Sequence, residues 1–244
     1  MAENKITSTR ADKTSAGQTI SRRSGLRPVS RDPLVTQVYQ ELQEGLMGGM
    51  FVPGESVTLR QLAEAFGTSI MPIREALSRL IAERALVMLP KRKVVIPEMT
   101  EDRFLHLTEL RRLVEPLTTR YAVPNMTDSS TSKMKSINKR LSQAVDSRDV
   151  RGALAANRDF HFTIYQFSES DTFLHFIRNL WVQVGPFLHL SMASPDMPWT
   201  TIHHGKILDS LPARDVEAAV QGVLDDIDES AEHLLAQKPF ASAK

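Results

Sequence analysis

The sequence predicts a mostly α-helical protein with two folded domains, and three observations support this class. Apolar residues recur at intervals of three and four through most of the chain, as they do on the buried face of a helix. Short apolar runs typical of paired strands occur only around Pro90, in the first half. The chain has 244 residues and a hydrophobic content of 41%, enough for one large or two ordinary domains with a packed core.

Residues 1–31 precede the first regular pattern and are rich in Ser, Thr, Lys and Arg. Seven lysines and arginines stand there against only Glu3 and Asp12. This composition predicts a disordered basic arm. Two roles stay open for it, an inert tail or an arm that adds non-specific attraction to DNA phosphates.

The first helix is predicted from Asp32 to Met50, where apolar residues follow helical spacing up to a Gly48-Gly49 stop. A turn at residues 52–55 leads to a second helix. Gly67 ends that helix, Ser69 can cap a third, and Pro72 is tolerated in its first turn. The buried side of the third helix is marked by Ile73, Leu77, Leu80 and Ile81, and its outward side by Met71, Arg74 and Ser78.

Two apolar runs, 86–89 and 94–96, flank Pro90-Lys91-Arg92-Lys93 and predict a hairpin with three cations at its tip. A helix, a tight turn, an outward-facing second helix and a basic hairpin form a winged helix-turn-helix, which binds DNA in the major groove. The simpler alternative is a helical hairpin in a larger core, with a solvated basic turn. The candidate DNA-binding residues are Arg60, Ser69, Arg74, Ser78, Lys91, Arg92 and Lys93.

The second half shows helical spacing throughout, with no strand signal and no internal repeat. Its first helix opens at Thr100 and should kink at Pro116. That helix carries one apolar stripe, as a helix that packs on a core does: Leu107, Leu110, Val114, Leu117 and Tyr121. Further helices are predicted at 126–145, 150–167, 172–192, 200–211 and 214–236. We therefore expect a winged helix-turn-helix domain at 32–98, an antiparallel all-α bundle at 99–238 and a tail at 239–244.

Composition narrows the function classes. The chain has no cysteine, so it has neither a disulfide framework nor a thiolate metal site. It has no apolar run of membrane-spanning length and no secretory signal pattern, so we expect a cytoplasmic protein without a membrane partner. The net charge of +1 is nearly neutral, so only the distribution of charge speaks for nucleic acid.

The stretch from Leu34 to Pro97 resembles the winged-helix domain of the GntR family of bacterial transcription regulators. The most specific matches are Pro53-Gly54 and the run from Pro72 to Leu77. The family usually has Arg where this chain has Ile70 and Gly where it has Lys93. The bundle resembles that of the FadR-type branch through Arg111–Glu115, Asn157–His161 and the set His204, Ile207, Leu211, Arg214 and Asp215.

This resemblance implies a divalent metal site at Asn157, His161, His204 and Asp226. Asn157 and His161 are four residues apart on one helix face, and Asp226 lies at the edge of the apolar stripe of the last helix. Such donors suit Zn²⁺, Mn²⁺ or Ni²⁺. His203 is an alternative to His204. In a purely structural interpretation Asn157 and His161 form a hydrogen-bonded core pair and Asp226 is a solvated edge residue.

The resemblance also implies a small carboxylate effector held by Arg111, because a guanidinium pairs with a carboxylate through two parallel hydrogen bonds. The alternative is a surface arginine paired with Glu115. No organic cofactor is expected.

We thus expect a homodimeric, ligand-responsive regulator that binds a palindromic operator in double-stranded DNA, more often a repressor in this family, and not an enzyme. Two other functions remain. A metal-dependent hydrolase would fit Asn157 and His161, but no HExxH, GxSxG or phosphate-loop motif occurs. A non-specific architectural DNA-binding protein would not need a large bundle with a polar cluster.

Overall fold

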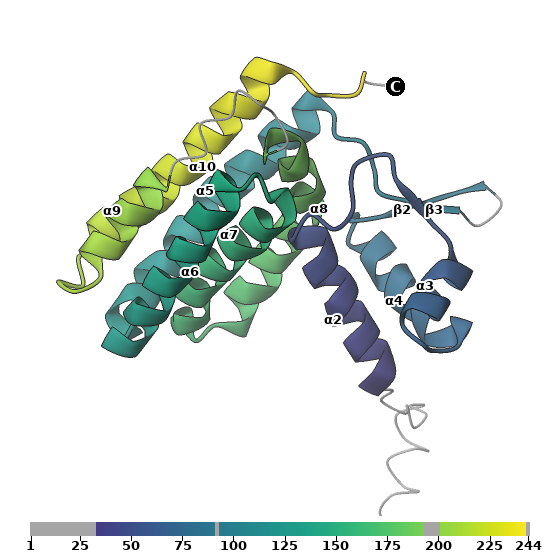
Figure 1. Cartoon of the computed structure of the whole chain (residues 1–244), viewed down its shortest axis with the longest axis horizontal. Coiled ribbons are helices and arrows are strands. Elements are labelled where there is room, and N and C mark those ends of the chain that lie inside the picture. The colour runs from purple at the N-terminus through teal and green to yellow at the C-terminus, as the bar shows by residue number, and fades with distance from the viewer. Residues whose placement is uncertain (1–32, 91–92, 193–200, 243–244) are drawn as a thin grey trace, which may run out of the picture. The chain divides into compact units, whose positions relative to one another are not determined.

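The computed structural model describes residues 33–90, 93–192 and 201–242 (Figure 1). The predicted basic arm, Lys91 and Arg92 lie outside these residues. Within the described ranges, no helix combines the length and the apolar character needed to cross a membrane.

The first domain has the predicted helix-turn-helix and hairpin. Its sheet is antiparallel with strand order β1-β3-β2, and Met88 of β2 faces Val94 of β3. The two-residue strand β1, which pairs Ser56 with Val95, was not predicted because it is too short to show a pattern. The elements are α2 (Pro33–Met47), β1 (Ser56–Val57), α3 (Leu59–Ala65), α4 (Ile70–Ala82), β2 (Val87–Leu89) and β3 (Lys93–Val95).

Local signals explain where α3 and α4 begin and end. Thr58 caps α3 in a reciprocal box with Gln61, which satisfies two backbone N–H groups. Gly67 then takes φ +60°, a left-handed conformation that glycine adopts without strain. Ser69 sits at the N-cap of α4, but its side chain makes no capping hydrogen bond. The predicted inward residues Ile73 and Leu77 are buried, so α4 presents its other side to solvent.

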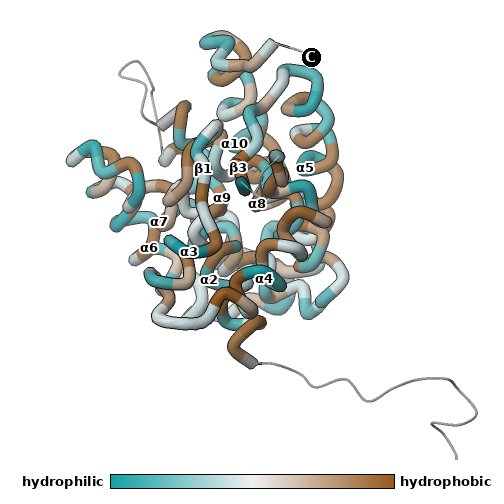
Figure 2. Tube along the Cα trace, turned by 90° about the vertical axis from the view of Figure 1, so that its right-hand side faces the viewer, coloured by the Kyte–Doolittle hydropathy of each residue, from teal (hydrophilic) through white to brown (hydrophobic). Residues whose placement is uncertain are grey.

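The second domain is the predicted helical bundle. Helix α10 packs against α5 and α9, and α7 packs against α6 and α8. In Figure 2, hydrophobic and hydrophilic residues alternate along the helices, as expected where each helix buries one face. Pro116 and Pro186 lie inside α5 and α8, which continue past them. The elements are α5 (Glu101–Ala122), η2 (Val123–Asn125), α6 (Asp128–Asp146), α7 (Val150–Tyr165), η3 (Gln166–Ser168), α8 (Asp171–Met192), α9 (Ile202–Ser210) and α10 (Val216–Gln237).

The apolar stripe of α5 does not face the core as its pattern suggested. Leu107 is buried and Val114 is half-buried, but Leu110, Leu117 and Tyr121 are exposed. The buried side is instead rotated toward polar residues: Thr108, Arg111, Glu115, Thr118 and Thr119. Hydrophobic spacing misplaced the inward face of α5 because the buried side carries the Arg111–Glu115 ion pair and three threonines, which a search for apolar residues does not detect.

The chain end also departs from the expected tail. The Phe240 ring lies 5.2 Å from that of Phe187 and 5.6 Å from that of Phe104, measured between centroids. The Ala241 N–H donates to the carbonyl of Met99 at 2.9 Å. Residues 240 and 241 therefore pack on the bundle.

Candidate functional site

Three of the four predicted metal ligands converge inside the bundle. His161 comes from α7, His204 from α9 and Asp226 from α10, and both imidazoles are buried. His161 Nε2 lies 3.1 Å from Asp226 Oδ2 and 3.2 Å from His204 Nε2, and His204 Nε2 lies 3.5 Å from Asp226 Oδ1. One donor atom from each residue fits within 4.8 Å of the others, a spacing that could hold one metal ion.

The opposite ring nitrogen of each imidazole has its own partner. His161 Nδ1 lies 3.3 Å from the Tyr165 hydroxyl, and His204 Nδ1 lies 3.1 Å from Asn138 Oδ1. Phe160 stacks on the His204 ring at 3.9 Å. These contacts aim both Nε2 atoms at one point, as outer partners do around metal-binding histidines. Tyr165 and Asn138 were not predicted from the sequence, although Tyr165 follows His161 by four residues on the same helix.

Asn157, the fourth predicted ligand, is buried one turn before His161. Its Oδ1 has no hydrogen-bond partner among the described residues. The structure therefore shows no hydrogen bond from His161 to this oxygen. An unsatisfied buried oxygen costs about 1–3 kcal/mol, and a bound cation would remove that cost. The residues thus fit a divalent metal.

The charge states of the cluster match what a cation needs. Burial lowers the pKa of His204 to about 3 against the opposing charge of Asp226, so the imidazole is neutral at pH 7. Burial alone would raise the pKa of Asp226, but the hydrogen bond from His161 and nearby positive charge hold it below its usual range. A neutral imidazole, as at His204, and an ionised carboxylate, as at Asp226, are forms that bind metal.

His203 lies outside this cluster. Its Nε2 is 3.2 Å from Glu229 Oε2, and its Nδ1 is 3.7 Å from Asp225 Oδ2. Asp225 also accepts a hydrogen bond from Lys206 at 3.0 Å. These are outer ion pairs, so the structure brings His204 and not His203 to the other predicted ligands.

Arg111 is buried next to the same cluster. Its Nε donates to Glu115 Oε1 at 2.6 Å, and its guanidinium carbon lies 5.2 Å from the Trp181 ring centroid. The predicted alternative was therefore right about the Glu115 partner but wrong about the surface location. Burial acts to lower the pKa of Arg111, but the charge and hydrogen bond of Glu115 raise it above its ordinary value, so Arg111 stays charged.

Glu115 links Arg111 to the histidines. It is fully buried and accepts hydrogen bonds from the Tyr165 hydroxyl at 2.6 Å and from Trp181 Nε1 at 3.0 Å. Because Tyr165 also contacts His161, one continuous polar network runs from Arg111 to the candidate metal centre. Both ends of this network were predicted from the sequence, but the central positions of Glu115 and Trp181 were not.

The predicted DNA-binding residues that the structure describes are all exposed: Arg60, Ser69, Arg74, Ser78 and Lys93. The Ser78 hydroxyl donates to the carbonyl of Arg74 at 2.8 Å, so only its acceptor lone pairs remain available. Arg74 and Ser78 also line a groove of about 260 Å³ between α4 and the sheet, together with Met88. Lys91 and Arg92 lie outside the described residues.

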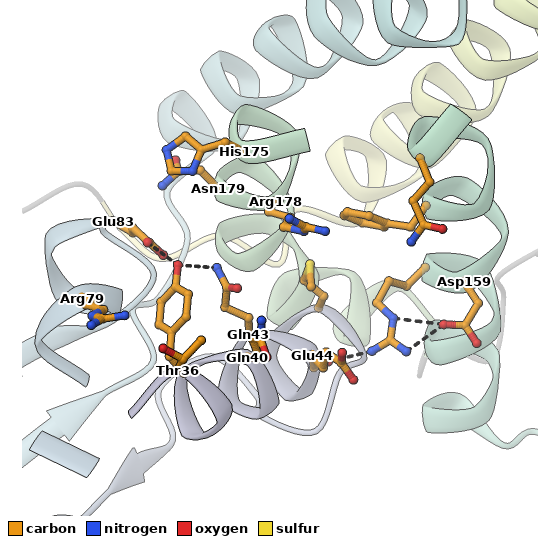
Figure 3. A pocket seen from close by; sticks show the side chains of 15 residues that line it. Thr36, Gln40, Gln43, Glu44, Arg79, Glu83, Asp159, His175, Arg178 and Asn179 are labelled. Atoms are coloured by element: carbon orange, nitrogen blue, oxygen red, sulfur yellow. Dashed lines mark hydrogen bonds and ion pairs between the residues drawn. The ribbon is translucent and has the colours of Figure 1, made fainter. Parts of the chain in front are cut away.

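A second, polar cavity of about 400 Å³ is lined by residues of α2, α4, α7 and α8 (Figure 3). On one side, the Tyr39 hydroxyl donates to Glu83 and accepts from Gln43. On the other, Arg158 of α7 pairs with Asp159 at 2.7 Å and donates to the carbonyl of Glu44 at 3.1 Å (Figure 3). The cavity therefore lies where the first helix of the winged domain contacts the bundle.

A second bundle arginine makes an equivalent contact. Arg103 of α5 donates through Nη2 to the carbonyl of Arg84 at 2.8 Å and to Gln183 Oε1 at 2.9 Å. Glu44 lies in the last turn of α2 and Arg84 lies two residues after α4, and the carboxyl end of a helix attracts cations.

A winged helix-turn-helix joined to a helical bundle with a buried polar centre defines a DNA-binding transcription regulator with a sensor domain. Residues 34–96 match the profile of the bacterial regulatory proteins of the gntR family, and residues 106–229 match that of the FCD domain. The chain belongs to the GntR family, in the FadR-type branch with an FCD domain, which confirms the resemblance seen in the sequence. Members of these families are transcription regulators and not enzymes.

Individual relatives agree with this assignment. The HTH-type transcriptional regulator McbR of Escherichia coli (strain K12) is 32% identical over 156 residues, which cover 64% of this chain and 71% of McbR. The solved structure of E. coli McbR/YncC has a TM-score of 0.79 at 27% identity, covering 85% of this chain and 100% of that one. The transcriptional repressor RspR of the same organism is 22% identical over 207 residues, covering 83% and 90% of the two chains.

Proposed function

We propose that the protein is a homodimeric repressor that binds a palindromic operator and releases it in response to a small carboxylate effector. The effector site is a divalent metal centre in the bundle. The observation that carries this proposal is the convergence of His161, His204 and Asp226, together with a buried Asn157 oxygen without a described partner one helical turn before His161. Binding to an operator in bacterial DNA implies a cytoplasmic location.

The proposed metal would be held by two imidazoles, one carboxylate and the Asn157 amide oxygen. This donor set suits Zn²⁺, Mn²⁺ or Ni²⁺. When bound, the ion supplies a positive charge and an open coordination position for an oxygen of the effector. No organic cofactor is needed for this role.

Arg111 would take the second oxygen of the effector. Its hydrogen bond within the described residues uses Nε, so both Nη groups keep donors for a ligand. The guanidinium carbon also lies over the Trp181 ring, a contact that helps to fix the direction of Arg111 before the effector arrives. A fixed, buried guanidinium near a cation favours a small anionic ligand such as a carboxylate.

The exposed stripe of α5 supports a dimer. Leu110, Leu113, Leu117 and Tyr121 are 43–67% exposed and spaced three or four residues apart on one helix. A contiguous apolar strip on a water-exposed helix marks an interaction surface. A second copy packed there would give the two-fold symmetry that a palindromic operator requires.

Repression is supported by the name of RspR as a repressor and requires only that the bound dimer block transcription. Effector binding would shift the bundle between two packings and so change how the two α4 helices fit successive major-groove segments. Such coupling is typically worth about 1–3 kcal/mol.

Metal content tests the site directly. Protein purified without chelators should contain Zn²⁺, Mn²⁺ or Ni²⁺ by elemental analysis, and adding the ion should raise the melting temperature of stripped protein. His161→Ala should lose the metal and the effector response but keep operator binding, because His161 lies in the bundle and not among the exposed residues of α4.

His203→Ala is the matched control, since His203 neighbours His204 but pairs outward with Asp225 and Glu229. It should bind metal normally. If wild type carries no metal and no added ion changes its melting temperature, the metal site is absent and Arg111 alone would have to anchor the effector.

A further inference from the structure

The first turn of α4 carries two large apolar side chains that face water. Ile70 is 43% exposed and Met71 is 58% exposed, although the next two residues, Pro72 and Ile73, are buried. Single exposed apolar residues are ordinary on protein surfaces. Two adjacent ones at the start of this particular helix call for a partner surface.

Their position identifies that surface. Met71, Arg74 and Ser78 follow at i, i+3 and i+7, and Ile70 precedes Arg74 by four residues, so all four share the outward side of α4. In a helix-turn-helix, the N-terminal residues of the second helix contact base edges in the major groove. Ile70 and Met71 occupy that N-terminal position in α4.

The chemistry of the DNA major groove decides which base Ile70 and Met71 favour. Adenine, guanine and cytosine present hydrogen-bonding groups on their major-groove edges, and thymine adds a C5-methyl group. An apolar side chain pressed on a polar edge removes water without replacing its hydrogen bonds, which is unfavourable. Against a thymine methyl group the same contact buries apolar area on both sides.

We propose that Ile70 and Met71 read thymine methyl groups, so that the operator carries thymines opposite the start of α4 in each half-site. This proposal rests on the DNA-binding function and adds the base that is read. Burial of one methyl group strengthens binding by about fourfold.

The test uses sites that the full-length protein selects from random-sequence duplexes. The strongest site is resynthesised with each thymine replaced in turn by deoxyuridine, which lacks only the methyl group and pairs normally. Wild type should lose about fourfold in affinity for each methyl group that faces α4. At those positions, the double variant Ile70→Ala/Met71→Ala should bind the thymine duplex and the deoxyuridine duplex with equal affinity.

Met50→Ala is the matched control, because Met50 is 57% exposed but lies outside α4, and this variant should keep the full methyl dependence. Ile70→Arg gives a positive readout, since arginine pairs with guanine and should shift the selected base at the facing position from thymine to guanine. This variant stays informative if the double alanine variant binds too weakly to measure.

Two results would overturn the proposal, and they differ in what they leave of the operator function. Sequence-specific binding that is insensitive to every deoxyuridine replacement removes the thymine contact but leaves the operator function. Failure to select any sequence removes the operator function and this inference together.

Discussion

The two domains carry their functional residues in opposite settings. In the winged domain, Met71, Arg74 and Ser78 lie on an exposed helix face. In the bundle, Arg111 and His161 are buried and tied to one another through Glu115 and Tyr165. Substitutions on the exposed face should therefore change binding alone, whereas those in the buried network should change stability and ligand response together.

The strongest test of this contrast is Glu115→Ala. The change leaves the buried Arg111 guanidinium without its counter-ion and removes the acceptor for Tyr165 and Trp181. Breaking one side of a buried pair costs about 3–5 kcal/mol. Urea denaturation should report a large loss in the free energy of unfolding. Glu217→Ala breaks the exposed ion pair with Arg120 and should leave the midpoint of urea denaturation almost unchanged. Equal losses of stability in the two variants would contradict the role of the buried network.

The exposed face is probed by Arg74→Ala. Specific operator binding should weaken by about 1–3 kcal/mol, with an unaltered melting temperature. Fluorescence anisotropy with the operator and with a scrambled duplex measures the specific and the non-specific affinity. Folded Arg74→Ala protein that binds its operator as tightly as wild type would refute the role of α4 in recognition.

The basic hairpin should behave differently from Arg74. Lys91→Ala and Lys93→Ala should weaken binding to all sequences similarly and flatten its salt dependence, because phosphate contacts act by releasing counterions. Titrations of both duplexes over a range of salt concentrations measure this slope. Loss of affinity for the operator alone would assign these lysines to base recognition instead.

The buried cluster also predicts a pH dependence for metal-stripped protein. His204 has a folded-state pKa of about 3 against an ordinary value of 6.5, so the unfolded chain binds more protons between these values. Stability should therefore be full above about pH 6.5 and fall on acidification, by about 1–2 kcal/mol between pH 7 and pH 5. The lowered pKa of Asp226 acts in the same direction but only at more acidic pH, below its unfolded value.

His204→Gln should remove most of that slope in urea titrations between pH 7 and pH 5. His233→Gln is the control, because His233 is partly exposed and lies 2.8 Å from Gln237 on the same helix. If the His204 variant keeps the wild-type slope, another group is responsible for the acid sensitivity.

The sequence predicted the winged domain better than the buried network of the bundle, and the reason is physical. The α3–Gly67–α4 turn and the β2–β3 hairpin depend on caps, glycine and alternation, which are local and visible in the chain. The Asn157–His161 spacing was visible too, because four residues make one helical turn. The meeting of Glu115, Trp181 and Asn138 with the histidines depends on packing between distant helices, which no local pattern encodes. The same packing turned the polar side of α5 inward against its hydrophobic pattern.

The smallest effect we expect comes from removing one hydrogen bond between the bundle and the winged domain. Arg158 and Arg140 both pair with Asp159, at 2.7 and 3.3 Å, but only Arg158 has a hydrogen bond to the carbonyl of Glu44 at the end of α2. Arg158→Ala should therefore loosen the link between bundle and winged domain, whereas Arg140→Ala should not.

Because the hydrogen bonds and ion pair described for the Arg158 side chain go to Asp159 and Glu44, metal content and operator affinity without effector should stay at wild-type values. The effector response of operator affinity should shrink by about 1 kcal/mol or less, the usual net worth of one hydrogen bond. Operator titrations with and without the carboxylate that proves to bind give this difference for both variants. If both respond like wild type, effector binding reaches the DNA-binding helices by another route, with the Arg103 contact to Arg84 as the next to remove.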